Sequence, residues 1–145
     1  MNMFEYTGCG LEGIFLKNGY TVEETPYGKA VSIADLDGLH GAISRDIIQQ
    51  KSPMTGHQFR FLRKEQDLVQ EELAALLRVD VQTVANWEKK GKDAIPGTAD
   101  VAMRAFYTAF IHVQFNLVPV AKDAKPDESA TFEREDEHWI DAIAA

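Results

Sequence analysis

The sequence predicts an α+β fold, in which a small antiparallel N-terminal sheet and one helix are followed by an all-helical domain and an acidic tail. Two patterns support this order of elements. Residues 4–33 contain short segments rich in β-branched and aromatic residues, separated by turn-forming residues. From residue 35 to about residue 113, apolar residues recur at helical spacing after capping residues. A chain of 145 residues suits one compact domain with an appendage.

The composition and the N-terminus limit the classes to which this protein can belong. Apolar residues make up 45% of the chain and charged residues 26%, which is typical of a folded globular protein. Charges, glycines or prolines interrupt every apolar run that is long enough to cross a bilayer, so we expect no membrane contact. The first residues lack the basic and apolar regions of an export signal. We therefore expect a soluble, cytoplasmic protein.

The net charge of −8 lowers the expectation of nucleic acid as a partner, but the acidic residues lie mainly at the two ends. Residues 1–53 hold 4 basic and 7 acidic side chains, residues 54–115 hold 8 of each, and residues 116–145 hold 3 and 8. Local clusters of charge, rather than the total, decide phosphate contact. The neutral middle third can therefore still bind nucleic acid.

Residues 4–33 are expected to form the small sheet. Residues 14–17 and 20–23 flank Asn18 and Gly19, a dipeptide that favours the type I′ turn of a β-hairpin. A second turn at residues 26–28 leads into a third expected strand at residues 30–33. Because an isolated hairpin is only marginally stable in water, this sheet needs a cover.

A helix that begins after Asp35 is the candidate for this cover. Asp35 can act as its N-cap, and Ser52 and Pro53 mark a break after it. Its apolar positions at helical spacing are Leu36, Leu39, Ile43 and Ile47.

Four further helices are expected between residues 54 and 115. Thr55 and Gln58 have the spacing of a capping box, and Met54 can pack on Phe59 as a hydrophobic staple. Breaks then separate helices at residues 70–77, 81–89 and 98–113, the second of which Asp80 can cap. The expected apolar stripe of the last helix consists of Val101, Ala105, Phe106, Ala109 and Phe110.

The segment after residue 115 is expected to be a mobile acidic tail, because residues 122–134 are polar and include Pro126. Trp139, Ile140 and Ile143 can form a short terminal helix if another surface receives them. A run of tail carboxylates is expected to be solvated rather than catalytic: Glu133, Glu135, Asp136 and Glu137.

Two further motifs do not indicate an enzyme or a metal site. Gly8, Gly10 and Gly13 match G-x-G-x-x-G, but that dinucleotide motif requires a helix directly after the glycines, where a strand is expected here. The four histidines form no H-x-H or H-x-x-x-H pair, and the single Cys9 cannot complete a zinc site. A Cys9–His pair across the fold stays open, because a sequence does not show spatial neighbours. We expect no catalytic residue, metal or cofactor.

Residues 59–90 carry a more specific pattern. Short helices at residues 70–77 and 81–88 are separated by about three residues, and the small Ala74 lets them approach closely. Apolar side chains can supply a shared core: Leu73, Leu77, Val79, Val84 and Trp87. Polar and cationic side chains of the second helix lie away from that core: Gln82, Thr83, Asn86, Lys89 and Lys90. Such side chains pair with base edges and phosphates in the major groove of DNA.

Residues 59–65, 70–74 and 81–88 together resemble the Cro/cI-type (XRE-family) helix-turn-helix. The resemblance covers about residues 54–115 and implies a five-helix, lambda repressor-like DNA-binding domain. Residues 95–100 and the N-terminal β segment also resemble the DNA-binding antitoxins of bacterial toxin–antitoxin systems. Some of those carry a zinc-binding N-terminal domain, whose cysteines this chain lacks. The chain departs from the family pattern at Val69, where Ser or Thr usually caps the second helix, and at Arg78, where Gly is common.

The pattern assigns an expected role to each site residue. By the resemblance, Arg63 and Glu88 match positions that commonly form a partly buried ion pair. Gln82 and Asn86 can each pair with adenine. Thr83 can donate or accept a hydrogen bond, and Val81 can pack on a thymine methyl. The remaining expected contacts, to phosphate, come from Gln70 with its neighbouring backbone amide and from Lys89 or Lys90.

The sequence thus favours a sequence-specific DNA-binding transcriptional regulator, and we expect a repressor. Because one such helix contacts few bases, a homodimer on a palindromic operator in double-stranded DNA is expected. The alternative is a protein-interaction module, such as a toxin-neutralising antitoxin or adaptor with little DNA binding, which the −8 charge and the acidic Glu71 and Glu72 favour. A helical core without a DNA role and an enzyme that uses Cys9 are two weaker alternatives.

Overall fold

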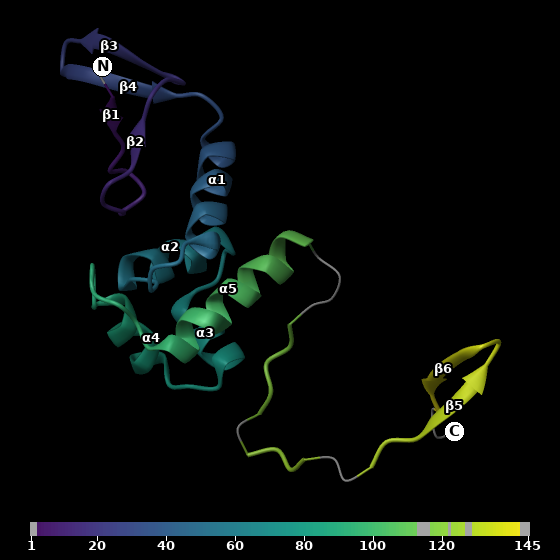
Figure 1. The fold of residues 1–145 in the computed structure, drawn as a ribbon. Coiled ribbons are helices and arrows are strands. Elements are labelled where there is room, and N and C mark those ends of the chain that lie inside the picture. The colour runs from purple at the N-terminus through teal and green to yellow at the C-terminus, as the bar shows by residue number, and fades with distance from the viewer. Residues whose placement is uncertain (1–2, 113–116, 122, 127–128, 143–145) are drawn as a thin grey trace.

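The computed structural model describes residues 3–112, 117–121, 123–126 and 129–142. Four short strands lead into five helices, and a further antiparallel pair of strands follows near the C-terminus (Figure 1). This order confirms the α+β class, with antiparallel strands at the N-terminus and a helical domain after them. Within the described residues, no helix is both long and apolar enough to cross a membrane.

The N-terminal strands pair in two separate two-stranded sheets. β1 (Phe4–Glu5) pairs antiparallel with β2 (Phe15–Leu16), and β3 (Tyr20–Thr25) pairs antiparallel with β4 (Gly28–Ile33). The third predicted strand, at residues 30–33, is confirmed as part of β4. The hairpin predicted across Asn18 and Gly19 is wrong, although Gly19 does adopt a positive φ of 81°.

The pairing that forms instead has a physical reason. The β3–β4 ladder joins six residue pairs, from Tyr20 with Ile33 to Thr25 with Gly28. The predicted four-residue strands would form a shorter ladder. β2 pairs with β1 instead, and its Leu16 is buried in the core. Tyr20 of β3 and Ile33 of β4 pack against the same core. Gly10 and Gly13, with φ of 79° and 71°, shape turns before β2, so a strand follows these glycines and no dinucleotide-binding helix does.

The predicted helix after Asp35 is confirmed as α1 (Leu36–Gln49). The Asp35 side chain accepts a hydrogen bond from the Gly38 backbone N–H at 3.1 Å. Ile43 and Ile47 are buried in one cluster with side chains of the β1–β2 region, namely Tyr6, Leu11 and Leu16. α1 therefore covers the N-terminal strands and leads from them to the helical domain (Figure 1).

The helical domain contains α2 (Gly56–Glu65), α3 (Gln70–Leu77), α4 (Val81–Glu88) and α5 (Gly97–His112). The predicted capping box is present: Thr55 Oγ1 accepts from the Gln58 N–H at 3.2 Å, and Gln58 Oε1 accepts from the Thr55 N–H at 3.0 Å. The fully buried core side chains of the domain include Met54, Phe59, Leu62, Leu73, Val84 and Met103. Leu77, Val79 and Trp87 pack against this core, as predicted.

The apolar stripe predicted on α5 is wrong in most of its members. Val101 is 69% exposed and Phe110 is 46% exposed, whereas Ala99, Met103 and Tyr107 are buried. Only Phe106 of the predicted stripe packs against the core. The end predicted for this helix, Val113, lies outside the described residues.

Two polar side chains of α5 determine which face of this helix is buried. Asp100 accepts a hydrogen bond from the buried Met54 N–H at 2.9 Å. Arg104 pairs with Asp100 and donates to two carbonyl oxygens after α1, those of Gln50 at 2.6 Å and Ser52 at 3.0 Å. These contacts turn residues 99, 103 and 107 inward. They also join the end of α1 to the helical domain.

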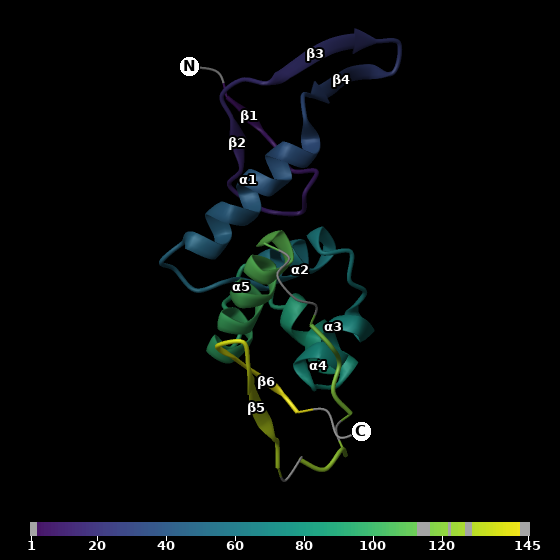
Figure 2. The same cartoon turned by 90° about the vertical axis from the view of Figure 1, so that its right-hand side faces the viewer.

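The C-terminal segment ends in a hairpin, so the predicted terminal helix is wrong. β5 (Phe132–Glu135) pairs antiparallel with β6 (His138–Asp141). Asp136 and Glu137 adopt positive φ of 47° and 70°, as a two-residue type I′ turn requires. Both views show the hairpin apart from α1 and the N-terminal strands (Figures 1 and 2). Ile143, which was expected to contribute to the helix, lies outside the described residues.

Candidate nucleic-acid interface

A tight turn joins α3 to α4. Arg78 ends α3 in the left-handed conformation, with φ 59° and ψ 43°. The Val79 N–H donates back to the Ala74 carbonyl at 3.0 Å, and the Ala74 side chain is buried. A left-handed residue in this position is usually glycine, since a Cβ atom makes that conformation less favourable. The structure thus explains why glycine is common at this position and shows that Arg78 adopts the same turn.

The inner face of α4 is fixed by an ion pair. Glu88 accepts hydrogen bonds from Arg63 Nε at 2.6 Å and Arg63 Nη2 at 3.0 Å, and both side chains are buried. Arg63 Nη1 also donates to the Leu68 carbonyl at 2.8 Å. Together with the fully buried Val84, these contacts set the orientation of α4 relative to α2 and α3.

Gln70 belongs to the same hydrogen-bond network, which the sequence did not indicate. Its Nε2 donates to Glu88 Oε1 at 3.1 Å, and the residue is half-buried. The side chain is therefore oriented by the Arg63–Glu88 pair rather than by a phosphate. The first backbone N–H groups of α3 remain directed out of the helix, as at any helix N-terminus.

α3 begins without a side-chain cap. Its N-cap, Val69, is 58% exposed and has no oxygen to accept a hydrogen bond. Glu72 reaches back to accept from the Val69 N–H at 2.9 Å, which is half of a capping box. The departure from the family pattern at Val69 thus leaves the N–H groups of the first turn without this partner.

The outer face of α4 presents polar groups to solvent. Val81, Gln82 and Asn86 are exposed, and Thr83 is half-buried. Gln82 Nε2 donates to Asn86 Oδ1 at 2.9 Å, one helical turn away. The remaining oxygen of Gln82 and the amide nitrogen of Asn86 can still form the donor and acceptor pairs that base edges offer.

Cations continue this surface after α4. Lys89 and Lys90, which were singled out from the sequence, are exposed, and so is Lys92 two residues further on. No phosphate contact was expected of Lys92, although its place in the same short run of lysines could have indicated one. The carbonyl of Gly91 accepts from the His57 N–H at 2.9 Å, which holds this loop beside the start of α2.

Among the described residues, no cluster of three or more His, Cys, Asp or Glu side chains is placed to hold a metal ion. Residues 59–99, which run from α2 into α5, match the family model described as Helix-turn-helix. No curated protein and no solved structure shows detectable similarity to the chain. Residues 59–99 thus form a helix-turn-helix of the Cro/cI type (XRE family), and this match supports a DNA-binding regulator.

Proposed function

We propose that this protein is a sequence-specific repressor that acts as a homodimer on a palindromic operator. One observation carries the proposal. α4 presents a hydrogen-bonded Gln82–Asn86 pair on its outer face, while the buried Arg63–Glu88 pair fixes its inner face. Side chains on a helix with a fixed orientation can enter a major groove together, which is what sequence-specific contact requires.

The proposed base contacts come from four side chains at the start and middle of α4. Gln82 and Asn86 each pair with an adenine edge, Thr83 donates or accepts one hydrogen bond, and Val81 packs on a thymine methyl. In the free protein the hydrogen bond between Gln82 and Asn86 keeps the two amides next to each other on the outer face of α4. Its exchange for contacts with bases costs little, because both side chains are exposed.

The proposed phosphate contacts flank these base contacts. The backbone N–H groups at the start of α3, next to Gln70, donate hydrogen bonds to one phosphate, since the N-terminal end of a helix carries partial positive charge. Lys89 and Lys90 add charge contacts on the other side of α4. Contacts of this kind place the helix in its register and contribute little sequence preference.

The remaining parts of the chain have proposed roles outside base contact. We divide the chain into an N-terminal region at residues 1–53, a DNA-binding domain at residues 54–115 and an acidic tail at residues 116–145. A helix of two turns contacts few base pairs, so two copies on two half-sites supply the affinity. The N-terminal region or the tail supplies the dimer contact or binds a second protein such as a toxin. The protein acts in the cytoplasm and has no catalytic residue or cofactor.

A gel-shift titration against the DNA upstream of its own gene tests this proposal. We expect a shifted band that survives excess random duplex at about 150 mM salt, where non-specific contacts are weakened. The Gln82→Ala/Asn86→Ala double variant is the matched control and should lose this band. Analytical ultracentrifugation of the complex should give two protein chains per duplex. A complex with one chain contradicts the homodimer. Failure to bind even at low salt, with a neighbouring gene product co-purifying, points instead to a protein-interaction module.

A further inference from the structure

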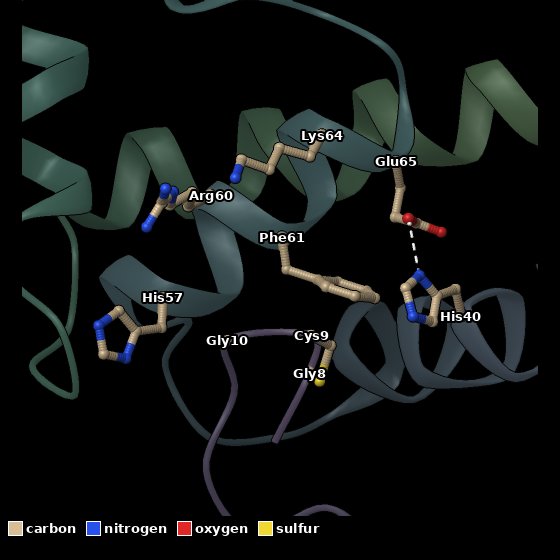
Figure 3. A pocket seen from close by; sticks show the side chains of 9 residues that line it. All are labelled: Gly8, Cys9, Gly10, His40, His57, Arg60, Phe61, Lys64 and Glu65. Atoms are coloured by element: carbon tan, nitrogen blue, oxygen red, sulfur yellow. Dashed lines mark hydrogen bonds and ion pairs between the residues drawn. The ribbon is translucent and has the colours of Figure 1, made fainter. Parts of the chain in front are cut away.

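A cavity of about 330 Å³ lies between the Gly8–Gly10 loop and α2, and no residue of α3 or α4 lines it (Figure 3). We propose that this cavity binds a small organic anion, a carboxylate or a phosphate monoester. The charged group of the ligand would lie beside Arg60 and Lys64, and its apolar part would lie on the Phe61 ring. This inference does not depend on the proposed repressor function.

Two cations supply the positive charge of the cavity. Arg60 and Lys64 are one helical turn apart on α2, and their side-chain ends point to the same side of the cavity (Figure 3). The nearest carboxylate to Arg60 is Glu88 at 4.0 Å, which already accepts two hydrogen bonds from Arg63. Lys64 forms no ion pair with any residue that the structure describes. Both charges are therefore available to a ligand.

One carboxylate, that of Glu65, lines the cavity and is paired with a histidine, and a second carboxylate, that of Glu12, is paired with the lining residue His57. Glu65 Oε2 accepts from His40 Nδ1 at 3.1 Å, and Glu12 Oε1 lies 2.6 Å from His57 Nδ1. An incoming anion thus meets Arg60 and Lys64 without an unpaired carboxylate between them. Among the residues that line the cavity, Arg60 and Lys64 carry positive charge and Glu65 carries negative charge, so the lining favours a negatively charged ligand.

The loop of Gly8, Cys9 and Gly10 forms the wall opposite α2 (Figure 3). The Phe61 ring lies between Cys9 and the His40–Glu65 pair and supplies an apolar surface (Figure 3). His40 and His57 line this cavity together with Cys9, and among the described residues no hydrogen bond joins Cys9 to either ring. A volume near the lower end of the range for ligand pockets suits a single-ring carboxylate or phosphate.

Cys9 makes the cavity testable, because it is the single cysteine of the chain and it lines the cavity. The rate at which iodoacetamide alkylates Cys9 is measured with phenyl phosphate, inorganic phosphate, or chloride at matched ionic strength. Phenyl phosphate should slow the reaction about tenfold at ten times its dissociation constant, by mass action. Inorganic phosphate should protect less, because it lacks the ring, and chloride should not protect.

Two charge variants make the test specific. Arg60→Gln/Lys64→Gln should abolish the protection, while Lys17→Gln/Lys29→Gln, which removes two exposed lysines elsewhere, should keep it. Chemical shifts of the Gly8 and Gly10 amides during the same titration give a second measure, which does not require Cys9 to react. Absence of both protection and shift overturns the proposal, and so does protection that persists in Arg60→Gln/Lys64→Gln. If a random DNA duplex protects Cys9 and phenyl phosphate does not, the cavity belongs to the DNA surface and the proposal is wrong.

Discussion

The guanidinium of Arg63 and the carboxylate of Glu88 meet in two parallel hydrogen bonds that join α2 to the end of α4. Both residues are less than a tenth exposed, so the pair lies in the domain rather than on its surface. Gln70 of α3 donates to the same carboxylate, which makes Glu88 the point where three helices meet. A paired charge at this depth is tolerated because each polar atom has a partner.

Glu88→Ala should lower the free energy of unfolding by about 3–5 kcal/mol, because it leaves the Arg63 charge buried without a partner. DNA binding should be lost in the same variant, since α4 loses the contact that sets its orientation. Urea denaturation followed by circular dichroism gives the first value, and a gel shift gives the second. Glu71→Ala, which removes an exposed carboxylate on α3, is the control and should change stability by less than about 0.5 kcal/mol. An unchanged free energy of unfolding for Glu88→Ala would show that the pair does not support the domain.

Val69→Thr should stabilise the domain by about 1 kcal/mol, because a hydroxyl at the N-cap can accept a hydrogen bond from an N–H of the first turn of α3. The backbone of Val69 already has the extended conformation of an N-cap, with φ −82° and ψ 164°. Because Val69 is exposed, the substitution removes little packing. Val69→Ala should give no such gain in urea denaturation. Equal stability of the Thr and Ala variants would mean that the hydroxyl makes no cap.

The free energy of unfolding should fall above pH 10, because the Tyr6 hydroxyl of the unfolded chain loses its proton there. Burial raises the pKa of the Tyr6 hydroxyl above its ordinary value of 10.0, and the nearby Cys9 and Glu65 add to this shift. Its O–H donates to His40 Nε2 at 2.8 Å, because the carboxylate of Glu65 can only accept and so takes the Nδ1 hydrogen. The folded state therefore retains the proton that the unfolded chain releases above pH 10. This contribution to stability is complete below pH 10 and is lost as the pH rises through the folded pKa.

The test compares wild-type protein with Tyr6→Phe in urea at pH 8 to 11. At pH 8 the variant should be less stable by about 0.5–1.5 kcal/mol, the worth of one hydrogen bond. The difference between the two proteins should shrink above pH 10, because Phe has no proton to lose. Tyr27→Phe, at a fully exposed hairpin tip, is the control and should follow the wild-type curve. A difference that stays constant or widens with pH would contradict this account.

Truncation after Leu117 should leave the fold intact and strengthen non-specific DNA binding at low salt. Residues 116–145 carry a net charge of −5, so their removal changes the charge of the chain from −8 to −3. No side chain of the described tail belongs to the buried core. We expect the free energy of unfolding to change by less than about 0.5 kcal/mol. The gain in DNA affinity should fade as salt screens the tail. Unfolding or loss of dimerisation on truncation would show instead that the tail is structural.

The elements that the sequence predicted correctly are those with local signals. The capping box at Thr55 and Gln58 and the N-cap at Asp35 each act within one helical turn, so their residues predict where α2 and α1 begin. The short helices at residues 70–77 and 81–88 are likewise confirmed. Helical periodicity and capping depend on neighbours in the chain and are visible without the fold.

The errors fall where distant contacts decide the outcome. Asn18 and Gly19 favour a turn, but the longer β3–β4 ladder and the β1–β2 pairing determine which strands meet. The buried face of α5 depends on Arg104, whose carbonyl partners lie more than fifty residues earlier in the chain. For the same reason the sequence did not predict the contact between Gln70 and Glu88 at the candidate site, nor the cavity beside Cys9, which lies apart from that site.

The central claim is that the outer face of α4 recognises DNA sequence. Its most direct test is the ratio of dissociation constants for random and specific duplexes, where the specific duplex is selected from a random pool with wild-type protein. Gln82→Ala and Asn86→Ala should each weaken specific binding by about 1–3 kcal/mol, or about 5- to 150-fold, and leave random binding unchanged. Lys90→Ala should weaken both duplexes alike and reduce the salt slope by about 1. The account predicts that the ratio falls in both alanine variants. A ratio that stays at the wild-type value at positions 82 and 86 would contradict it.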